Sequence, residues 1–371
     1  MNETKESIIR KIVLKSEESI KVYETGRMEN LDFLRLISIF FVVCIHYVGW
    51  GGIANADGVS MVNFALSGVV AVACNCAVNC FYMISGYFCD VGRVQKQNIF
   101  FDHAKRSIKK VWFPTLFYSV LIPLLLIFSG IIELSASQTV MTFLPVMGNQ
   151  YWFATCYIAL MALSPFIARA MYRMEDKDLK WLVAVLFFLD CIQPVLGYNA
   201  FSNIGYGLLH AVTMYVIGYT IKKKEIRLKS LYCVVAFIAS VGLIGLVTVL
   251  SIKLTGDRNR TIADYNSILM VIQSVAFFSC FLNIRIKKIR FSRFAPYVFG
   301  VYLLNDNQYA REFLWQKVFH CSEFYGSSLM PLHFLAVTVG FTAAAIGIEW
   351  VRIHCWKWVK RHIKVTSYSL K

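Results

Sequence analysis

Long apolar segments recur along this chain of 371 residues, and they restrict its fold more than any other feature. A helix needs about 20 mostly apolar residues to cross the hydrocarbon core of a membrane, where every backbone polar group must be bonded internally. Hydrophobic residues make up 57% of the chain and charged residues only 16%, a balance outside the range of soluble domains. The sequence therefore predicts an all-α polytopic membrane protein.

The predicted count of transmembrane helices is about ten. The segments are residues 31–50, 62–88, 111–132, 151–171, 180–197, 204–221, 230–252, 264–283, 294–310 and 329–351. The ninth is the weakest, because it is short and ends in Asn305, Asp306 and Asn307. We expect a basic tail over 1–30, one membrane domain over 31–352 and a second basic tail over 353–371.

The distribution of Lys and Arg predicts the orientation. Of the 38 basic residues, 32 fall on one side of the ten segments, five fall on the other, and Arg35 lies within the first segment. Cytoplasmic loops carry the excess of basic residues in membrane proteins, so both termini are expected to be cytoplasmic. Basic residues occur in every cytoplasmic loop without interleaved aromatics, which favours contact with anionic membrane lipids and argues against nucleic acid as a partner.

Two ionisable side chains, Arg35 and His46, lie inside the first segment. They are eleven residues apart, which is close to three full helical turns, so they share one face about 16 Å apart along the axis. Placing ionisable groups in the hydrocarbon core of a membrane is energetically unfavourable, so an aligned pair indicates a functional polar cavity. In the simpler alternative, Arg35 pairs with Asp32 and snorkels to the interface, while His46 bonds a neighbouring helix.

The second segment carries a polar stripe and a small-residue contact. Asn75, Asn79 and Tyr82 follow helical spacing and are expected to face the bundle interior. Gly86 allows another backbone to approach closely, and the neighbouring Ser85 is more simply a helix–helix hydrogen bond than a nucleophile. The eleven cysteines lack the spacing of zinc ligands, so we expect neither a metal site nor a structural disulfide.

Four segments together carry a resemblance to a known family. They are LDFLRLISIFFVVCIHY, FYMISGYF, YWFATCYIALMALSPFI and VYLLNDN, in that order. The chain resembles acyltransferase family 3, a family of bacterial integral membrane acyltransferases. The resemblance implies a multi-pass enzyme of the inner membrane that transfers an acyl group, commonly acetyl or succinyl. The implied donor is cytoplasmic acyl-CoA, without a permanently bound cofactor, and the implied acceptor is a hydroxyl of a surface polysaccharide or of its lipid-linked precursor.

Residues of the family's motifs map onto this chain. Its essential Arg and His map onto Arg35 and His46, and its FFxxSG-type segment maps onto residues 81–86. Its WF-containing segment start maps onto Trp152 and Phe153. One departure is that Asn305 follows Tyr302, Leu303 and Leu304 where the family usually has a YLxH pattern. Asparagine hydrogen-bonds but does not titrate near neutral pH.

The candidate donor site lies at the cytoplasmic end. The phosphates of acyl-CoA need cations, which Arg35 with Arg106, Lys109 and Lys110 can supply, and Ser85 lies at the same end. An ordinary topological role explains the three basic residues of the loop more simply. His46, near the outer end, can deprotonate a sugar hydroxyl or carry the acyl group transiently.

The candidate acceptor residues are Asn79, Trp152, His210 and Asn305. Trp152 offers a platform for stacking a sugar, although an aromatic anchor at the interface is the simpler interpretation. His210 can compensate for Asn305, or it can be a buried histidine satisfied by a neighbour, and the intramembrane Asp190 can orient a histidine or hold a helix contact. Two other functions stay open: a transporter of a small polar solute such as an amino acid, and a non-catalytic glycan-binding protein.

Overall fold

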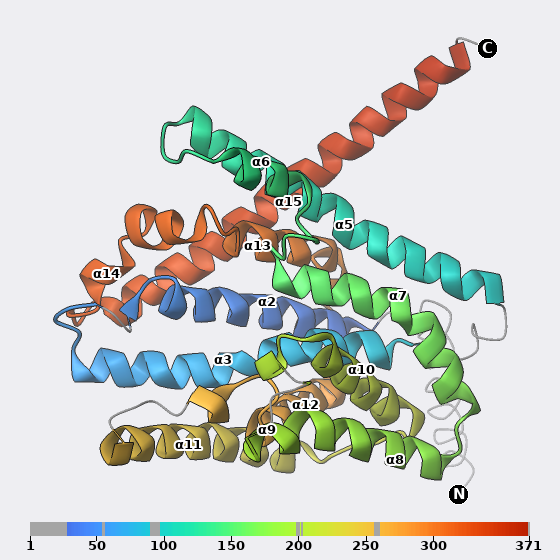
Figure 1. Cartoon of the computed structure of the whole chain (residues 1–371), viewed down its shortest axis with the longest axis vertical. Helices are drawn as coiled ribbons and strands as arrows, with labels where there is room; N and C mark the ends of the chain where they lie inside the picture. The colour runs from blue at the N-terminus through green and yellow to red at the C-terminus, as the bar shows by residue number, and fades with distance from the viewer. Residues whose placement is uncertain are drawn as a thin grey trace, which may run out of the picture.

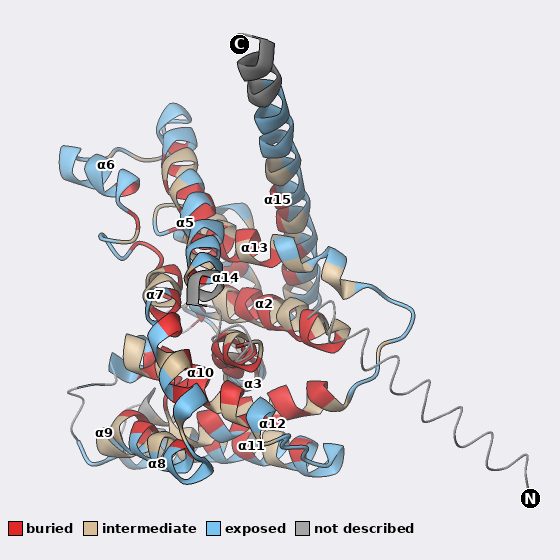
Figure 2. Ribbon diagram, turned by 90° about the vertical axis from the view of Figure 1, so that its right-hand side faces the viewer, coloured by how far each residue is buried: buried red, intermediate tan, exposed pale blue. Residues whose placement is uncertain are grey.

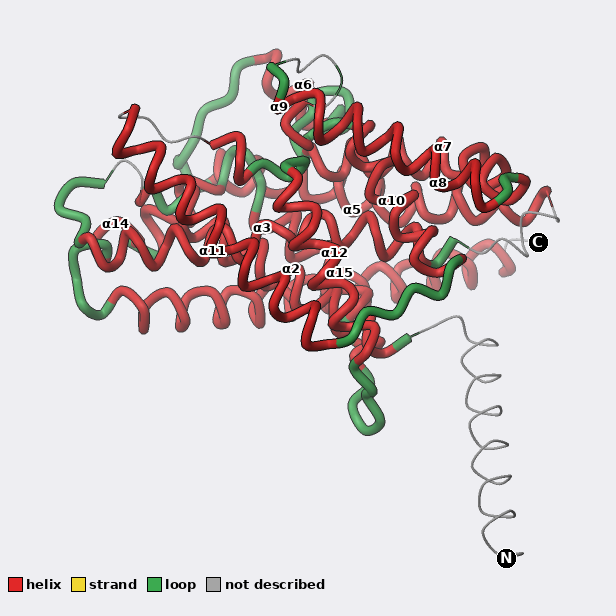
Figure 3. The backbone as a smooth tube through the Cα atoms, turned by 90° about the horizontal axis from the view of Figure 1, so that it is seen from below, coloured by secondary structure: helices red, strands yellow, loops and turns green. Residues whose placement is uncertain are grey.

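The computed structural model describes residues 28–53, 56–89, 97–197, 201, 203–255 and 260–369. Within these ranges the chain forms helices and loops without any β-strand (Figure 3). The all-helical fold predicted from the sequence is confirmed. The basic N-terminal tail, apart from its last three residues, lies outside the described ranges, as do parts of several loops.

Six helices are long and apolar enough to cross a membrane, so this is a multi-pass membrane protein. They are α2 (Glu29–Gly49), α3 (Met61–Tyr87), α5 (Gln97–Phe128), α7 (Trp152–Arg173), α11 (Ser230–Thr255) and α15 (Met330–Ser369). Each corresponds to one of the predicted apolar segments, and α5 and α15 extend well beyond theirs.

The other four predicted segments form shorter or interrupted helices. The fifth consists of α8 (Asp176–Phe187), a π-helical turn η2 (Phe188–Ile192) and α9 (Gln193–Val195). The sixth and eighth are α10 (Leu208–Lys223) and α12 (Ile268–Asn283), and the ninth consists of the 3₁₀ turns η5 (Phe291–Arg293) and η6 (Ala295–Tyr297) followed by α13 (Val298–Asn305). The count of ten and the assignment of sides stay predictions. The remaining short elements are α6 (Ala136–Phe143), η3 (Asn203–Gly205), η4 (Arg260–Ala263), η7 (Phe313–Val318) and α14 (Cys321–Phe324).

The core is built around α3, which packs against α2, α10 and α12. Buried residues gather on these central helices, whereas much of α11 and α15 is exposed (Figure 2). Two glycines bring α3 and α10 into backbone contact: a Cβ on Gly86 would lie 1.8 Å from the Tyr215 carbonyl oxygen, and one on Gly218 would lie 2.1 Å from that of Met83. The close approach predicted at Gly86 is therefore present, and it is reciprocal.

The long helix α15 crosses the bundle obliquely, and its C-terminal part projects away from it (Figure 1). It carries a buried carboxylate, Glu349, that the sequence analysis did not single out. Tyr118 of α5 donates to Glu349 at 2.8 Å, and Arg352 donates two hydrogen bonds of 2.6 Å. Gly300 of α13 leaves the room that this carboxylate fills. A paired and hydrogen-bonded charge is the form in which a buried carboxylate is tolerated.

Candidate functional site

Helix α2 carries both candidate catalytic residues on one uninterrupted helix, so Arg35 and His46 lie about 16 Å apart along its axis. Its N-terminal end is fixed by polar contacts to other helices. The Glu29 carboxylate accepts hydrogen bonds from the backbone N–H and hydroxyl of Ser292 at 2.9 and 2.7 Å, and the Asn30 amide donates to the Phe281 carbonyl at 2.9 Å. These anchors set the depth at which α2 presents each side chain.

At the other end of α2, His46 faces the turn that follows α13. Its Nε2 atom lies 3.9 Å from the Asp306 carboxylate, and its ring meets the edge of Trp50 at 6.2 Å between centroids. The Asn305 side chain lies next to the imidazole, although no hydrogen bond of ordinary geometry joins them. The Nδ1 atom of His46 is buried and has no hydrogen-bond partner in the described part of the chain. One ring nitrogen therefore faces a carboxylate, and the other is free to accept a proton.

Three consecutive polar residues at the end of α13 and directly after it are buried. Asn305, Asp306 and Asn307 are each at most 3% exposed. The Asn307 amide donates to the Tyr151 hydroxyl at 2.7 Å, and that hydroxyl donates to the Leu303 carbonyl at 3.2 Å. These bonds tie the turn to the start of α7. The sequence analysis singled out Asn305 as a candidate acceptor residue, but it read Asp306 and Asn307 only as a weakness of the ninth segment.

Arg311 adds a cation beside Asp306. One of its guanidinium nitrogens lies 3.6 Å from the Asp306 carboxylate, and its guanidinium carbon lies 3.6 Å from the centre of the Trp50 ring. Arg311 also lines a cavity of about 550 Å³ between α6 and the segment after α13. His46, Asp306 and Arg311 thus form a row that leads from the cavity to the buried imidazole. Neither Asp306 nor Arg311 was a predicted site residue, although a carboxylate and an arginine in a sparsely charged part of the sequence are the signal that could have found them.

Arg35 lies toward the opposite end of α2 and forms an ion pair with Asp32, as the simpler interpretation predicts. Its guanidinium lies 5.3 Å from the centre of the Phe88 ring. The side chain is 29% exposed, whereas Asp32 is buried. The Oδ2 atom of Asp32 has no hydrogen-bond partner within the described ranges. Arg35 can therefore keep this pair and still present donors to a phosphate.

The three basic residues predicted to assist Arg35 are exposed on α5. Arg106 donates to the Asp102 carbonyl of its own helix at 3.2 Å, and Lys109 and Lys110 follow one turn later. The structure gives Arg35 a partner on its own helix rather than one of these side chains. Their role in binding a donor stays a prediction.

Ser85 and Trp152 both engage neighbouring side chains. The Ser85 hydroxyl donates to the Phe81 carbonyl at 3.0 Å and lies 3.1 Å from the Tyr157 hydroxyl. It thus forms the helix–helix contact that the simpler interpretation predicted. The Trp152 ring lies 4.5 Å from that of Tyr206 and stacks on Tyr265 at 5.6 Å.

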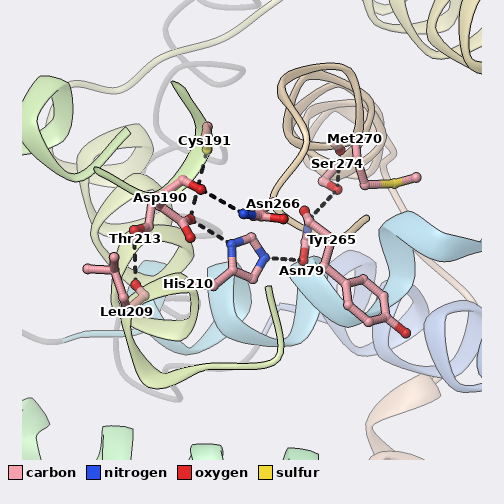
Figure 4. Close-up of polar contacts among 10 residues, drawn as sticks. All are labelled: Asn79, Asp190, Cys191, Leu209, His210, Thr213, Tyr265, Asn266, Met270 and Ser274. Atoms are coloured by element: carbon pink, nitrogen blue, oxygen red, sulfur yellow. Dashed lines mark hydrogen bonds and ion pairs between the residues drawn. The ribbon is translucent and has the colours of Figure 1, made fainter. Parts of the chain in front are cut away.

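His210 belongs to a buried network on the other side of α3 (Figure 4). Its Nδ1 atom lies 2.7 Å from the Asp190 carboxylate, and its Nε2 atom lies 2.8 Å from the Asn79 amide oxygen. The Asn79 amide nitrogen donates to the Tyr265 carbonyl at 2.9 Å and to the Ser274 hydroxyl at 3.0 Å, and Asp190 projects from the π-helical turn. Both imidazole nitrogens are occupied, which fits the satisfied buried histidine of the sequence analysis. Asp190 orients this histidine.

Within the described residues, no cluster of three His, Cys, Asp or Glu side chains could hold a metal ion. The cysteines, all of which fall in the described ranges, form no disulfide there. The side chains gathered beside His46 offer imidazole, carboxylate and guanidinium groups.

Comparison with family models decides the identity of the fold. The model described as an acyltransferase domain, that of acyltransferase family 3, matches residues 28–350. The chain belongs to acyltransferase family 3. The match covers nearly the whole chain, so the resemblance stated on sequence motifs is confirmed. Searches of curated proteins and of solved structures returned no match. The family match supports acyl transfer as the general activity of this protein.

Proposed function

We propose that this acyltransferase moves an acyl group, acetyl or succinyl, from cytoplasmic acyl-CoA to a hydroxyl of a surface polysaccharide or its lipid-linked precursor. The observation that carries the proposal is the position of His46. Its Nε2 atom lies 3.9 Å from the Asp306 carboxylate, and its Nδ1 atom has no partner in the described part of the chain. The same carboxylate lies 3.6 Å from Arg311, which lines an open cavity. A base oriented by a carboxylate and placed within reach of a nucleophile is the arrangement that hydroxyl activation requires.

The proposed reaction uses His46 as general base. Its free nitrogen takes the proton of the sugar hydroxyl as the oxygen attacks the thioester carbonyl carbon. The C–S bond then breaks, and the coenzyme A thiolate leaves with the proton that the imidazolium returns. Asp306 stabilises the transient imidazolium, because an opposite charge nearby favours the protonated ring. Transient acylation of His46 itself is the alternative sequence of steps, with the same overall balance.

Arg35 serves the donor in this scheme. A guanidinium presents a fork of donors that matches phosphate oxygens, and the exposed part of Arg35 lies at the end of α2 that charge distribution assigns to the cytoplasm. The distance of about 16 Å between Arg35 and His46 along the helix suits an extended pantetheine arm. The protein works in the bacterial inner membrane, with the cavity beside Arg311 opening outward.

The test uses purified full-length protein in lipid nanodiscs with radiolabelled acetyl-CoA or succinyl-CoA and a panel of glycan acceptors. Transfer of label to a glycan is the expected result. His46→Ala should keep donor binding and lose about 10²- to 10⁴-fold in transfer, the range for removing a general base. His354→Ala is the matched control, because this histidine is exposed on the far part of α15. A well-folded His46→Ala variant that acylates at the parent rate would contradict the mechanism.

A further inference from the structure

The cavity beside Arg311 is preformed and has polar walls. One wall is α6, whose N-terminus is closed by a capping box between Ser135 and Gln138. The end of α6 and the loop after it are tied to α5, because the Ser119 hydroxyl donates to the Thr142 carbonyl and also contacts the Gln150 amide. The opposite wall reaches back to α6 through a long hydrogen bond of 3.5 Å from the Tyr309 hydroxyl to the Gln138 carbonyl. Gln138, Gln150, Tyr309 and Arg311 all line the space of about 550 Å³.

Arg311 and Gln150 are the two lining residues that carry buried donor nitrogens. The Nε atom of Arg311 has no hydrogen-bond partner within the described ranges, whereas the amide of Gln150, a residue that is only 5% exposed, lies against the Ser119 hydroxyl. That hydroxyl has one proton, which it donates to the Thr142 carbonyl at 2.7 Å, so it can accept a hydrogen bond from the Gln150 amide. Arg311, whose side chain is 28% exposed, is therefore the group in this lining that offers donors to a ligand with acceptor oxygens.

The charge of Arg311 narrows the class of ligand. Its separation of 3.6 Å from Asp306 is longer than a hydrogen bond, so that carboxylate attracts the guanidinium without filling its donors. The ring of Trp50 covers one face of the guanidinium. A planar fork of N–H groups binds a carboxylate better than it binds a neutral hydroxyl.

The charges present during acyl transfer also favour a ligand that carries a carboxylate. When His46 holds the proton of the acceptor, the row contains two cations, His46 and Arg311, and one carboxylate, Asp306. An anion bound to Arg311 restores neutrality and leaves Asp306 to the imidazolium. A neutral sugar cannot do so.

We propose that this cavity binds an acidic sugar unit of the acceptor glycan, with its carboxylate on Arg311. The identification of this sugar as part of the acceptor rests on the proposed function, whereas its binding to the cavity does not. In this proposal, Arg311 determines the specificity for the glycan acceptor. Lys317 is a second basic residue of the same segment and is exposed outside the cavity, so it provides a matched control.

The experiment measures binding by calorimetry to full-length protein in nanodiscs, without any acyl donor. The probes are a disaccharide ending in glucuronic acid and its matched disaccharide ending in glucose. The parent protein should bind the acidic probe at least about tenfold more tightly, since hydrogen bonds to charged groups exceed neutral ones by about that factor. Arg311→Gln should abolish the preference, whereas Lys317→Gln should keep it. Because the preference is a ratio within one variant, partial unfolding cannot imitate its loss.

A further variant tests the role of the cavity separately from the charge of Arg311. Ser137 lies exposed on α6 at the cavity lining, and Ser137→Trp should weaken binding of both probes by obstructing the space. Equal affinity of the parent for the two probes, no binding of either, or an acidic preference that survives Arg311→Gln would each overturn the inference. Acidic-sugar binding without acyl transfer to any glycan would instead overturn the proposed function. Transfer with no acidic preference would leave the function standing and remove this inference.

Discussion

His46 and Asp306 lie 3.9 Å apart, although 260 residues separate them in the sequence. The histidine comes from the end of α2 and the carboxylate from the turn that ends α13, and the packing of these two helices brings them together. Arg311 lies 3.6 Å from the same carboxylate oxygen. The carboxylate is therefore shared between a titratable base and a permanent cation.

This geometry predicts that Asp306 is a positioning residue for His46. Asp306→Asn keeps the size of the side chain but removes the charge that stabilises the imidazolium, so transfer should fall about 10- to 100-fold, or about 1.4 to 2.7 kcal/mol in the barrier. The effect should appear in kcat with KM for acyl-CoA unchanged, as measured by initial rates. Glu312→Gln, at an exposed position of the same segment, is the control. An unchanged kcat for Asp306→Asn would show that the carboxylate does not act on His46.

Arg35→Lys should affect the donor rather than the base. Lysine keeps the positive charge beside Asp32 but loses the fork that matches phosphate. Weaker binding of acyl-CoA, seen as a higher KM, should therefore accompany reduced turnover. Lys109→Gln on α5 tests the simpler topological role of the exposed basic residues and should leave KM unchanged. If Arg35→Lys binds acyl-CoA as the parent does, the donor role of Arg35 is wrong.

Asn305 should tolerate a histidine but not a leucine. The residue is fully buried next to His46, where its amide contributes hydrogen-bonding capacity without titrating. Asn305→His should retain activity, whereas Asn305→Leu should reduce turnover in the same transfer assay. Parent-like turnover of the leucine variant would show that this position has no part in the reaction.

His210 should matter for stability more than for chemistry. His210→Ala removes two hydrogen bonds in the core and strands the Asp190 carboxylate, so unfolding should become easier by about 1 to 3 kcal/mol. Thermal unfolding in detergent should show a lower Tm, and the folded fraction should transfer acyl groups at nearly the parent rate. His354→Ala serves as the control here too. A His210→Ala variant with parent Tm and lost transfer would instead place His210 in the acceptor site.

The sides of the membrane can be tested directly. Reporter fusions should place the loop of residues 222–229 in the cytoplasm and the loop of residues 133–150 outside, because 32 of 38 basic residues lie on the predicted inner side. The result also decides whether the cavity under α6 opens outward. Both loops on one side would contradict the ten-helix topology.

The sequence by itself determined the helical membrane fold, the family and the spacing of Arg35 and His46. These properties are local: an apolar run of sufficient length must form a helix in a membrane, and helical periodicity places two residues on one face. The pairing of Arg35 with Asp32 is also local, since residues three apart meet on a helix. For the same reason, Gly86 could be recognised as a site of close approach before its partner, Tyr215, was known.

Only the tertiary structure decided which polar residues share a site. Asp306 and Arg311 come close to His46 because α13 packs against α2. The pattern of residues within a single segment does not reveal this packing. His210 looked like a substitute for Asn305 by depth alone, yet α3 and the π-helical turn of residues 188–192 enclose it with Asn79 and Asp190. Depth in a membrane follows from position along a helix, whereas the partner of a side chain follows from the rotation and contacts of neighbouring helices. Those are set by the whole bundle.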